Sequence, residues 1–302
     1  MCSFFVVSYK IKGSQKDKDG TFFMKTAIVT DSTAYIPKQL REELNIHMIP
    51  LNVIFGTEVY HEEVDLTAHA FYEEIKTKDL PTTSQPPIGK FVELFEELAA
   101  NYDAVISIHL SSGISGTYQG AVTAGTMVEG IKFYPFDSEI SCMVQGFYAL
   151  EAAEMAGRGE LPERIISRLE ELKQSADAYF MVDDLSNLQR GGRLSSAQAF
   201  IGSLLQVKPL LHFEEKVIVP FEKIRTRKKA LKRIVDLLGE AVSGGEDYRA
   251  VIIHANREAE AEEWRKELAG LYPHVEFMIG YFGAVIGTHL GEGAMGMGWM
   301  KK

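Results

Sequence analysis

A short segment carries the strongest structural signal in the chain: Ser107-Ile108-His109-Leu110-Ser111-Ser112-Gly113-Ile114-Ser115-Gly116-Thr117-Tyr118-Gln119. It follows an apolar run at residues 104–106 and leads into residues 119–128, which have the pattern of a helix. The first backbone N–H groups of a helix have no internal partner and lie at the positive end of its dipole, so a carboxylate or phosphate can bind there. The alternative is an ordinary turn before a capped helix, because serine, threonine and glycine are common loop residues.

Polar residues also follow other expected strands of the first half. Residues 27–30 form an apolar run that ends in Asp31 and Ser32, and residues 131–136 end in Asp137. Strands and helices alternate up to residue 156, which predicts a mostly parallel sheet with helices on both faces. Ligands of such sheets bind beyond the carboxyl ends of the strands. We therefore expect Asp31, Ser32 and the segment 111–113 to lie along one edge.

Residues 80–87 are expected to form an exposed loop rich in hydroxyl groups, because prolines stand near both of its ends and Thr83 and Ser84 lie between them. One histidine of the second half is a further candidate. His289 lies in Gly-Thr-His-Leu-Gly-Glu-Gly, where flanking glycines leave the ring little steric cover. A ligand is therefore expected to be able to reach it.

The pattern changes near residue 165, where we place a domain boundary. Residues 24–165 are predicted to form an N-terminal α/β domain, and residues 166–302 a C-terminal α+β domain with a largely antiparallel sheet. In that second domain residues 195–207 have the pattern of an apolar helix, and residues 275–279 are the last expected strand. Residues 1–23 are expected to be a loose extension or a misassigned start.

Composition limits the classes of function. The 302 residues carry a formal net charge of −10, which argues against a general nucleic-acid binder with a basic face. The two cysteines form no pair of the Cys-x-x-Cys type, which fits a cytoplasmic protein. The Gly-x-G-x-x-G match at residues 291–296 lacks a βαβ context, and no metal-ligand spacing recurs, so neither cofactor nor metal is expected.

Several of these segments together resemble the DegV family. They are residues 26–33 (TAIVTDST), 83–86 (TSQP) and 107–118 (SIHLSSGISGTY), with 190–193 (RGGR) and 287–289 (GTH) in the second half. The resemblance covers residues 25–302. Two positions depart from the family pattern: Pro87 stands where the family often has Ser, and residues 291–293 are Gly-Glu-Gly in place of a common Gly-Pro-Gly.

The resemblance implies a protein without chemistry of its own that binds a long-chain fatty acid between its two domains. In bacterial relatives such a protein presents the acid to a separate, ATP-using fatty acid kinase, which makes an acyl phosphate for phospholipid synthesis. Membrane contact is expected to be transient. The resemblance places the carboxylate on Thr83 and Ser112 with His289 close by, and gives Arg225 a role in docking or phosphotransfer with the kinase. Supporting positions are Ser84, Ser111, Gly113, Asp31 and Ser32.

The residues themselves leave two other functions open. One is a serine hydrolase or acyl transferase that uses Ser112 with His289, although the Gly-x-Ser-x-Gly motif is missing. The other is a binder of a small phosphorylated metabolite at the same helix start. An acyl tail requires a dry channel. Candidates for its walls are Phe200, Ile201, Leu204, Leu205, Met278, Ile279 and Phe282, with ordinary core packing as the alternative for each.

Overall fold

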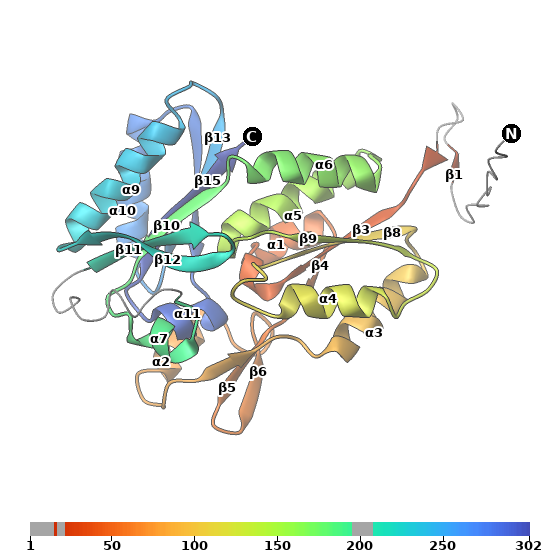
Figure 1. The fold of residues 1–302 in the computed structure, drawn as a ribbon, viewed down its shortest axis with the longest axis horizontal. Helices are drawn as coiled ribbons and strands as arrows, with labels where there is room; N and C mark the ends of the chain where they lie inside the picture. The colour runs from red at the N-terminus through yellow and green to blue at the C-terminus, as the bar shows by residue number, and fades with distance from the viewer. Residues whose placement is uncertain (1–14, 17–21, 195–207) are drawn as a thin grey trace, which may run out of the picture.

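The computed structural model describes residues 15–16, 22–194 and 208–302 (Figure 1). A short antiparallel pair, β1 (Gln15–Lys16) and β2 (Phe22–Phe23), precedes the rest of the fold. The apolar helix expected at residues 195–207 lies outside the described residues. Among the residues that are described, no helix is both long and apolar enough to cross a membrane.

The first half contains the expected parallel sheet. Its strand order is β4 (Ile46–Ile49), β3 (Thr26–Asp31), β8 (Ala104–His109) and β9 (Lys132–Asp137), and every pair is parallel. Helices α3 (Ile88–Ala99) and α4 (Thr117–Gly125) pack on one face, while α5 (Cys142–Gly157) and α6 (Pro162–Lys173) pack on the other. Because both faces are covered, β3 and β8 are buried along their whole length. This confirms the predicted parallel sheet.

After β4, an edge strand of the first sheet, the chain enters a second, antiparallel sheet of three strands. It consists of β6 (Glu58–His61), β5 (Asn52–Phe55) and β7 (Thr82–Ser84). The expectation of an exposed loop at residues 80–87 is therefore wrong at its centre, because residues 82–84 pair with β5. The flanking prolines limit this strand to three residues without preventing it, since Pro is tolerated at strand ends. Three short helices complete the region: η1 (Ser32–Ala34), α1 (Lys38–Glu43) and α2 (Ala68–Glu74).

The second half contains the expected, largely antiparallel sheet. Its order is β12 (Val217–Ile224), β11 (Lys208–Glu214), β10 (Asp177–Met181), β15 (Met295–Lys301), β13 (Tyr248–His254) and β14 (Val275–Tyr281), with only β13 and β14 parallel. The expectation that residues 275–279 are the last strand is wrong. Strand β15 lies in the middle of the sheet, but its alternating glycines weaken the sequence signal of a strand.

Helix α5 lies between the four-stranded parallel sheet and the six-stranded sheet and packs against both. It is buried around most of its circumference, because it packs against β3 and β8 on one side and against β13, β14 and β15 on the other (Figure 1). Helices α9 (Arg227–Ala241) and α10 (Glu258–Leu271) cover the outer face of the six-stranded sheet. The expected boundary at residue 165 falls inside α6, and the division into two domains stays a prediction.

Candidate functional site

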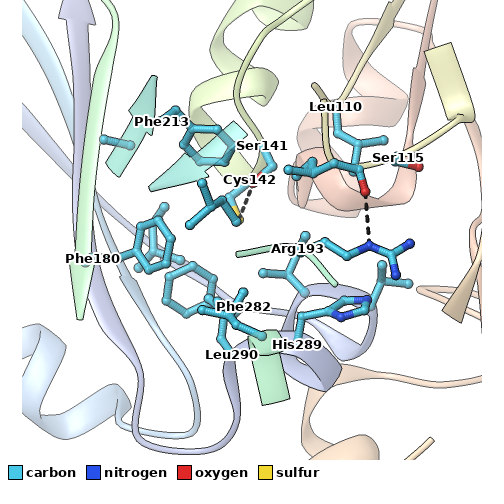
Figure 2. Close-up of a pocket in the computed structure, with 18 of the residues that line it drawn as sticks. Leu110, Ser115, Ser141, Cys142, Phe180, Arg193, Phe213, Phe282, His289 and Leu290 are labelled. Carbon is cyan, nitrogen blue, oxygen red and sulfur yellow. Dashed lines mark hydrogen bonds between the residues drawn. The ribbon is translucent and has the colours of Figure 1, made fainter. Parts of the chain in front are cut away.

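A largely apolar cavity lies between the three-stranded sheet, the loop after β8 and the six-stranded sheet (Figure 2). The space free of protein atoms inside it, open solvent at its mouth included, is about 770 Å³. The first half of the chain and the second half both supply walls. Apolar wall residues include Leu51, Leu110, Ile114, Cys142, Phe180, Leu188, Phe213, Ile218, Ile253, Phe282, Val285, Ile286 and Leu290.

Polar side chains gather at one end of this cavity. Thr83 Oγ1 lies 2.8 Å from Nε2 of His289, and both residues line the cavity. Ser115 and Arg193 line the same cavity, and Figure 2 shows them with His289 on the side away from Phe213. Arg193 is held in place because its Nε donates to the carbonyl of Ile114 at 3.2 Å. The result is an apolar cavity with donors at one end.

His289 is an electrically neutral member of this group at neutral pH. Burial lowers the pKa of His289 to about 4, and the positive charges of Arg193 and Arg190 add to that effect. The other ring nitrogen, Nδ1, is buried and has no hydrogen-bond partner among the described residues. When Nε2 carries the ring proton, it donates to Thr83, and the Thr83 hydroxyl is then free to donate to a ligand.

The His289 ring has its place because two helices meet there. His289 is on α11 (Ala284–Leu290), and Gly191 ends α7 (Ser186–Gly191), which packs against α11. A Cβ atom on Gly191 would overlap the His289 ring, so only glycine allows this approach. The ring is accessible through the cavity, and its backbone is helical.

A buried carboxylate fixes the start of α11. Glu62 accepts hydrogen bonds from Ser32 Oγ at 2.6 Å, from Tyr35 Oη at 2.9 Å and from the backbone N–H of Val285 at 2.6 Å. Burial raises the pKa of Glu62 from 4.5 to about 7, although these three donors oppose the shift. Glu62 and Ser32 are thus used to attach α11 to the first half of the chain.

The predicted carboxylate ligand Ser112 is not on the cavity wall. Its hydroxyl donates to Asp137 Oδ2 at 2.6 Å, and its backbone N–H donates to Asp137 Oδ1 at 3.1 Å. The neighbouring Ser111 donates to the carbonyl of Lys216 at 2.6 Å, and Gly113 packs so closely against Lys216 that a Cβ atom would overlap it. This part of the loop therefore contacts the β11–β12 hairpin, while Ile114 and Ser115 contact the cavity.

Asp31 belongs to a separate buried network. Its Oδ2 lies 3.0 Å from Nδ1 of His109, whose Nε2 lies 2.7 Å from Oγ of Ser107. The order Ser–His–Asp resembles that of a hydrolase triad, but all three side chains are fully buried and none lines the cavity. Asp31 also accepts from the backbone N–H of Leu110 at 3.0 Å. The network ties β3 to β8.

The remaining predicted residues divide between the cavity and other places. Ser84 lines the cavity and accepts from Asn52 Nδ2 at 3.1 Å. Arg225 is exposed, follows β12 and lines a separate surface hollow with Lys229 and Lys232. Of the predicted channel residues, Phe282 lines the cavity, while Met278 and Ile279 pack against the cores without reaching it. Phe200, Ile201, Leu204 and Leu205 lie outside the described residues.

Comparison with known proteins shows the family of the chain. The model of the DegV family, described as "Uncharacterised protein, DegV family", matches residues 25–302. This chain belongs to the DegV family. Protein DegV of Bacillus subtilis (strain 168) is 66% identical over 281 residues, which are 92% of this chain and 100% of that protein.

Solved structures of DegV proteins share the fold. The crystal structure of DegV from Bacillus subtilis, described as a fatty acid binding protein, has a TM-score of 0.88 and 65% identity, and covers 92% of this chain and 100% of its own. A DegV family protein from Thermus thermophilus, described by its fatty acid binding, has a TM-score of 0.87 and 30% identity. That match covers 92% of this chain and 100% of the other chain.

Two residues that line the cavity of this DegV protein, Ser115 and Arg193, could not be predicted from the motifs. Ser115 has the same residue type as Ser112 in the same loop, and only the packing of Ser111 and Gly113 against Lys216 shows which serine contacts the cavity. Arg193 is part of the RGGR segment, but nothing in its spacing relates it to His289. Within residues 22–194 and 208–302, no group of three or more His, Cys, Asp or Glu side chains is arranged to hold a metal ion.

Proposed function

We propose that this chain binds a long-chain fatty acid in the cavity, with the carboxylate beside Thr83 and His289 and the tail among the apolar walls. The observation that carries the proposal is the pairing of an apolar cavity with hydroxyl and imidazole groups at one end. The fatty acid binding described for related DegV proteins supports the same ligand class. A small phosphorylated metabolite fits less well, because most of the wall is apolar.

The energetics favour an acyl chain. Each buried methylene contributes about 0.8 kcal/mol, so a chain of about 16 carbons has a large gross affinity before ordering costs are subtracted. Burying a carboxylate without partners is costly. Thr83 can donate one hydrogen bond when His289 carries its proton on Nε2. Ser115 can donate a second, and the guanidinium of Arg193 supplies positive charge nearby.

We further propose that the chain presents this acid to a separate ATP-dependent kinase, which converts it to an acyl phosphate for phospholipid synthesis. Arg225 is the proposed contact with that kinase. Its position on an exposed surface with Lys229 and Lys232 suits an acidic partner. Loading and release of the acid are proposed to involve transient membrane contact.

Mass spectrometry of lipid extracted from gently purified protein tests the first proposal. A fatty acid bound at a ratio near one per chain is the expected result, and protein that stays empty when offered palmitate would refute it. Thermal shifts with palmitate and with sugar phosphates then compare the two ligand classes. For the second proposal, loaded protein is mixed with ATP and a purified fatty acid kinase, and acyl phosphate is trapped with hydroxylamine. An Arg225→Glu variant that supports the same yield would refute the assigned contact.

A further inference from the structure

Two hollows in this molecule meet at one aromatic side chain. Phe213 lines the apolar cavity and also a second hollow, which has about 450 Å³ free of protein atoms when open solvent is included. Within the described part of the chain, Phe213 is the one residue that lines both the cavity and the second hollow. Figure 2 shows Phe213 on the side of the cavity away from His289 and Arg193. Phe213 therefore stands between the far end of the cavity and the second hollow.

The second hollow is chemically unlike the cavity. Its walls include five charged side chains: Glu139, Lys173, Asp177, Glu215 and Lys216. Tyr148 also lines it, and its buried hydroxyl has no hydrogen-bond partner among the described residues. A hydrocarbon chain that entered this hollow would cover polar groups that need water or a hydrogen-bond partner. An acyl tail thus gains from burial up to Phe213 and gains little beyond it.

Phe213 is held by contacts on both sides. Within the cavity its ring lies 6.3 Å, centroid to centroid, from the ring of Phe180. Phe213 also precedes the tight turn at Glu215 and Lys216 that joins β11 to β12. The turn is fastened to the first half of the chain, because Ser111 donates to the carbonyl of Lys216 and Lys216 Nζ lies 3.0 Å from Asp137 Oδ2. These contacts fix the hairpin, and with it the position of the ring.

We propose that Phe213 is the wall that sets the longest acyl chain this protein accepts. The proposal rests on the proposed fatty acid binding and assigns its limit in chain length to one side chain. Removing the ring opens space next to Phe180 that remains apolar, whereas the charged walls of the second hollow limit any further extension. The expected gain in length is about two carbons, which corresponds to up to about fifteenfold in affinity at about 0.8 kcal/mol per methylene.

The test measures dissociation constants of saturated acids of increasing length for the full chain and its variants. Phe213→Ala is expected to move the length of tightest binding about two carbons upward. Phe213→Trp is expected to move it downward, and loss of stability alone cannot produce shifts of opposite sign. Phe277→Ala is the matched control, because Phe277 is also half-buried on the six-stranded sheet and lines neither hollow. Its length profile is expected to equal that of the unmodified chain.

The outcomes separate the two proposals. An unmodified chain that binds no acid of any length refutes the fatty acid function itself. An unmodified chain that binds, together with Phe213 variants whose profile has the same optimum, refutes the role of Phe213. A uniform loss of affinity at all lengths in Phe213→Ala and Phe213→Trp also refutes it, because a wall at the far end acts only on chains that reach it.

Discussion

Replacing Thr83 with valine removes one hydroxyl and keeps the shape of the side chain. In the structure that hydroxyl lies 2.8 Å from Nε2 of His289 at the polar end of the cavity. Valine can neither accept from the imidazole nor donate to a carboxylate. Because Nδ1 of His289 already has no partner among the described residues, the Thr83→Val variant leaves both ring nitrogens without a protein partner there.

The expected losses follow from these contacts. A hydrogen bond to a charged group contributes about 1.5–3 kcal/mol, so palmitate should bind about 10- to 150-fold more weakly. Leaving a buried polar group unsatisfied costs about 1–3 kcal/mol, so the free energy of unfolding of the empty protein should also fall. Isothermal titration calorimetry gives the first quantity and urea unfolding gives the second. Palmityl alcohol is titrated in parallel because it lacks the carboxylate.

Thr82→Val is the matched control for this experiment. Thr82 precedes Thr83 on β7, is exposed and does not line the cavity. The Thr82→Val variant should bind palmitate with the same affinity as the unmodified chain. Equal affinity of Thr83→Val and Thr82→Val for palmitate would refute the assignment of Thr83. An equal loss for palmitate and for palmityl alcohol in Thr83→Val would show that the hydroxyl does not act on the carboxylate.

Three further substitutions test the surroundings of the site. Burial raises the pKa of Glu62 from 4.5 to about 7, so the folded state binds the proton more tightly than the unfolded state does. The free energy of unfolding should therefore fall by about 3 kcal/mol as pH rises from 4.5 to 7. Urea unfolding of Glu62→Gln should lack this part of the pH dependence, and an unchanged slope of unfolding free energy against pH would contradict the prediction. Ser112→Ala should weaken palmitate binding less than about threefold in calorimetry, because its hydroxyl is bonded to Asp137; a tenfold loss would return Ser112 to the carboxylate site. Gly191→Ala should weaken binding at least tenfold by displacing the His289 ring, and normal affinity would show that the ring tolerates the methyl group.

The sequence predicted the parallel sheet well, because its signals are local. Buried strands such as β3 and β8 are short apolar runs followed by polar residues and a helix, and both faces of the sheet are covered as that pattern requires. The pattern fails for β15. Its first four residues alternate Met and Gly, and the segment forms a central strand only because β10 and β13 lie on either side.

The candidate site was predictable in part. The resemblance points to both Thr83 and His289, and the two side chains lie 2.8 Å apart although their positions differ by 206 in the chain. The resemblance implies Ser112, whereas Ser115 lines the cavity, because a loop of small residues does not reveal which of its sides faces a ligand. That choice depends on Lys216, a residue of a distant hairpin whose carbonyl accepts from Ser111. Long-range contacts of this kind leave no mark on local sequence.

The polar residues at the edge of the parallel sheet thus serve mainly to hold the walls of the cavity in place. Ser32 and Tyr35 hold Glu62, which binds the start of α11 and thereby places His289 at the polar end. Ser111 holds the hairpin that carries Phe213 at the opposite end. Each end thus includes an element of the second half that is fastened by residues following strands of the first half. A displacement of the two halves relative to each other would therefore change both ends of the cavity at once, and the hydrogen bonds of Glu62 and Ser111 oppose that displacement.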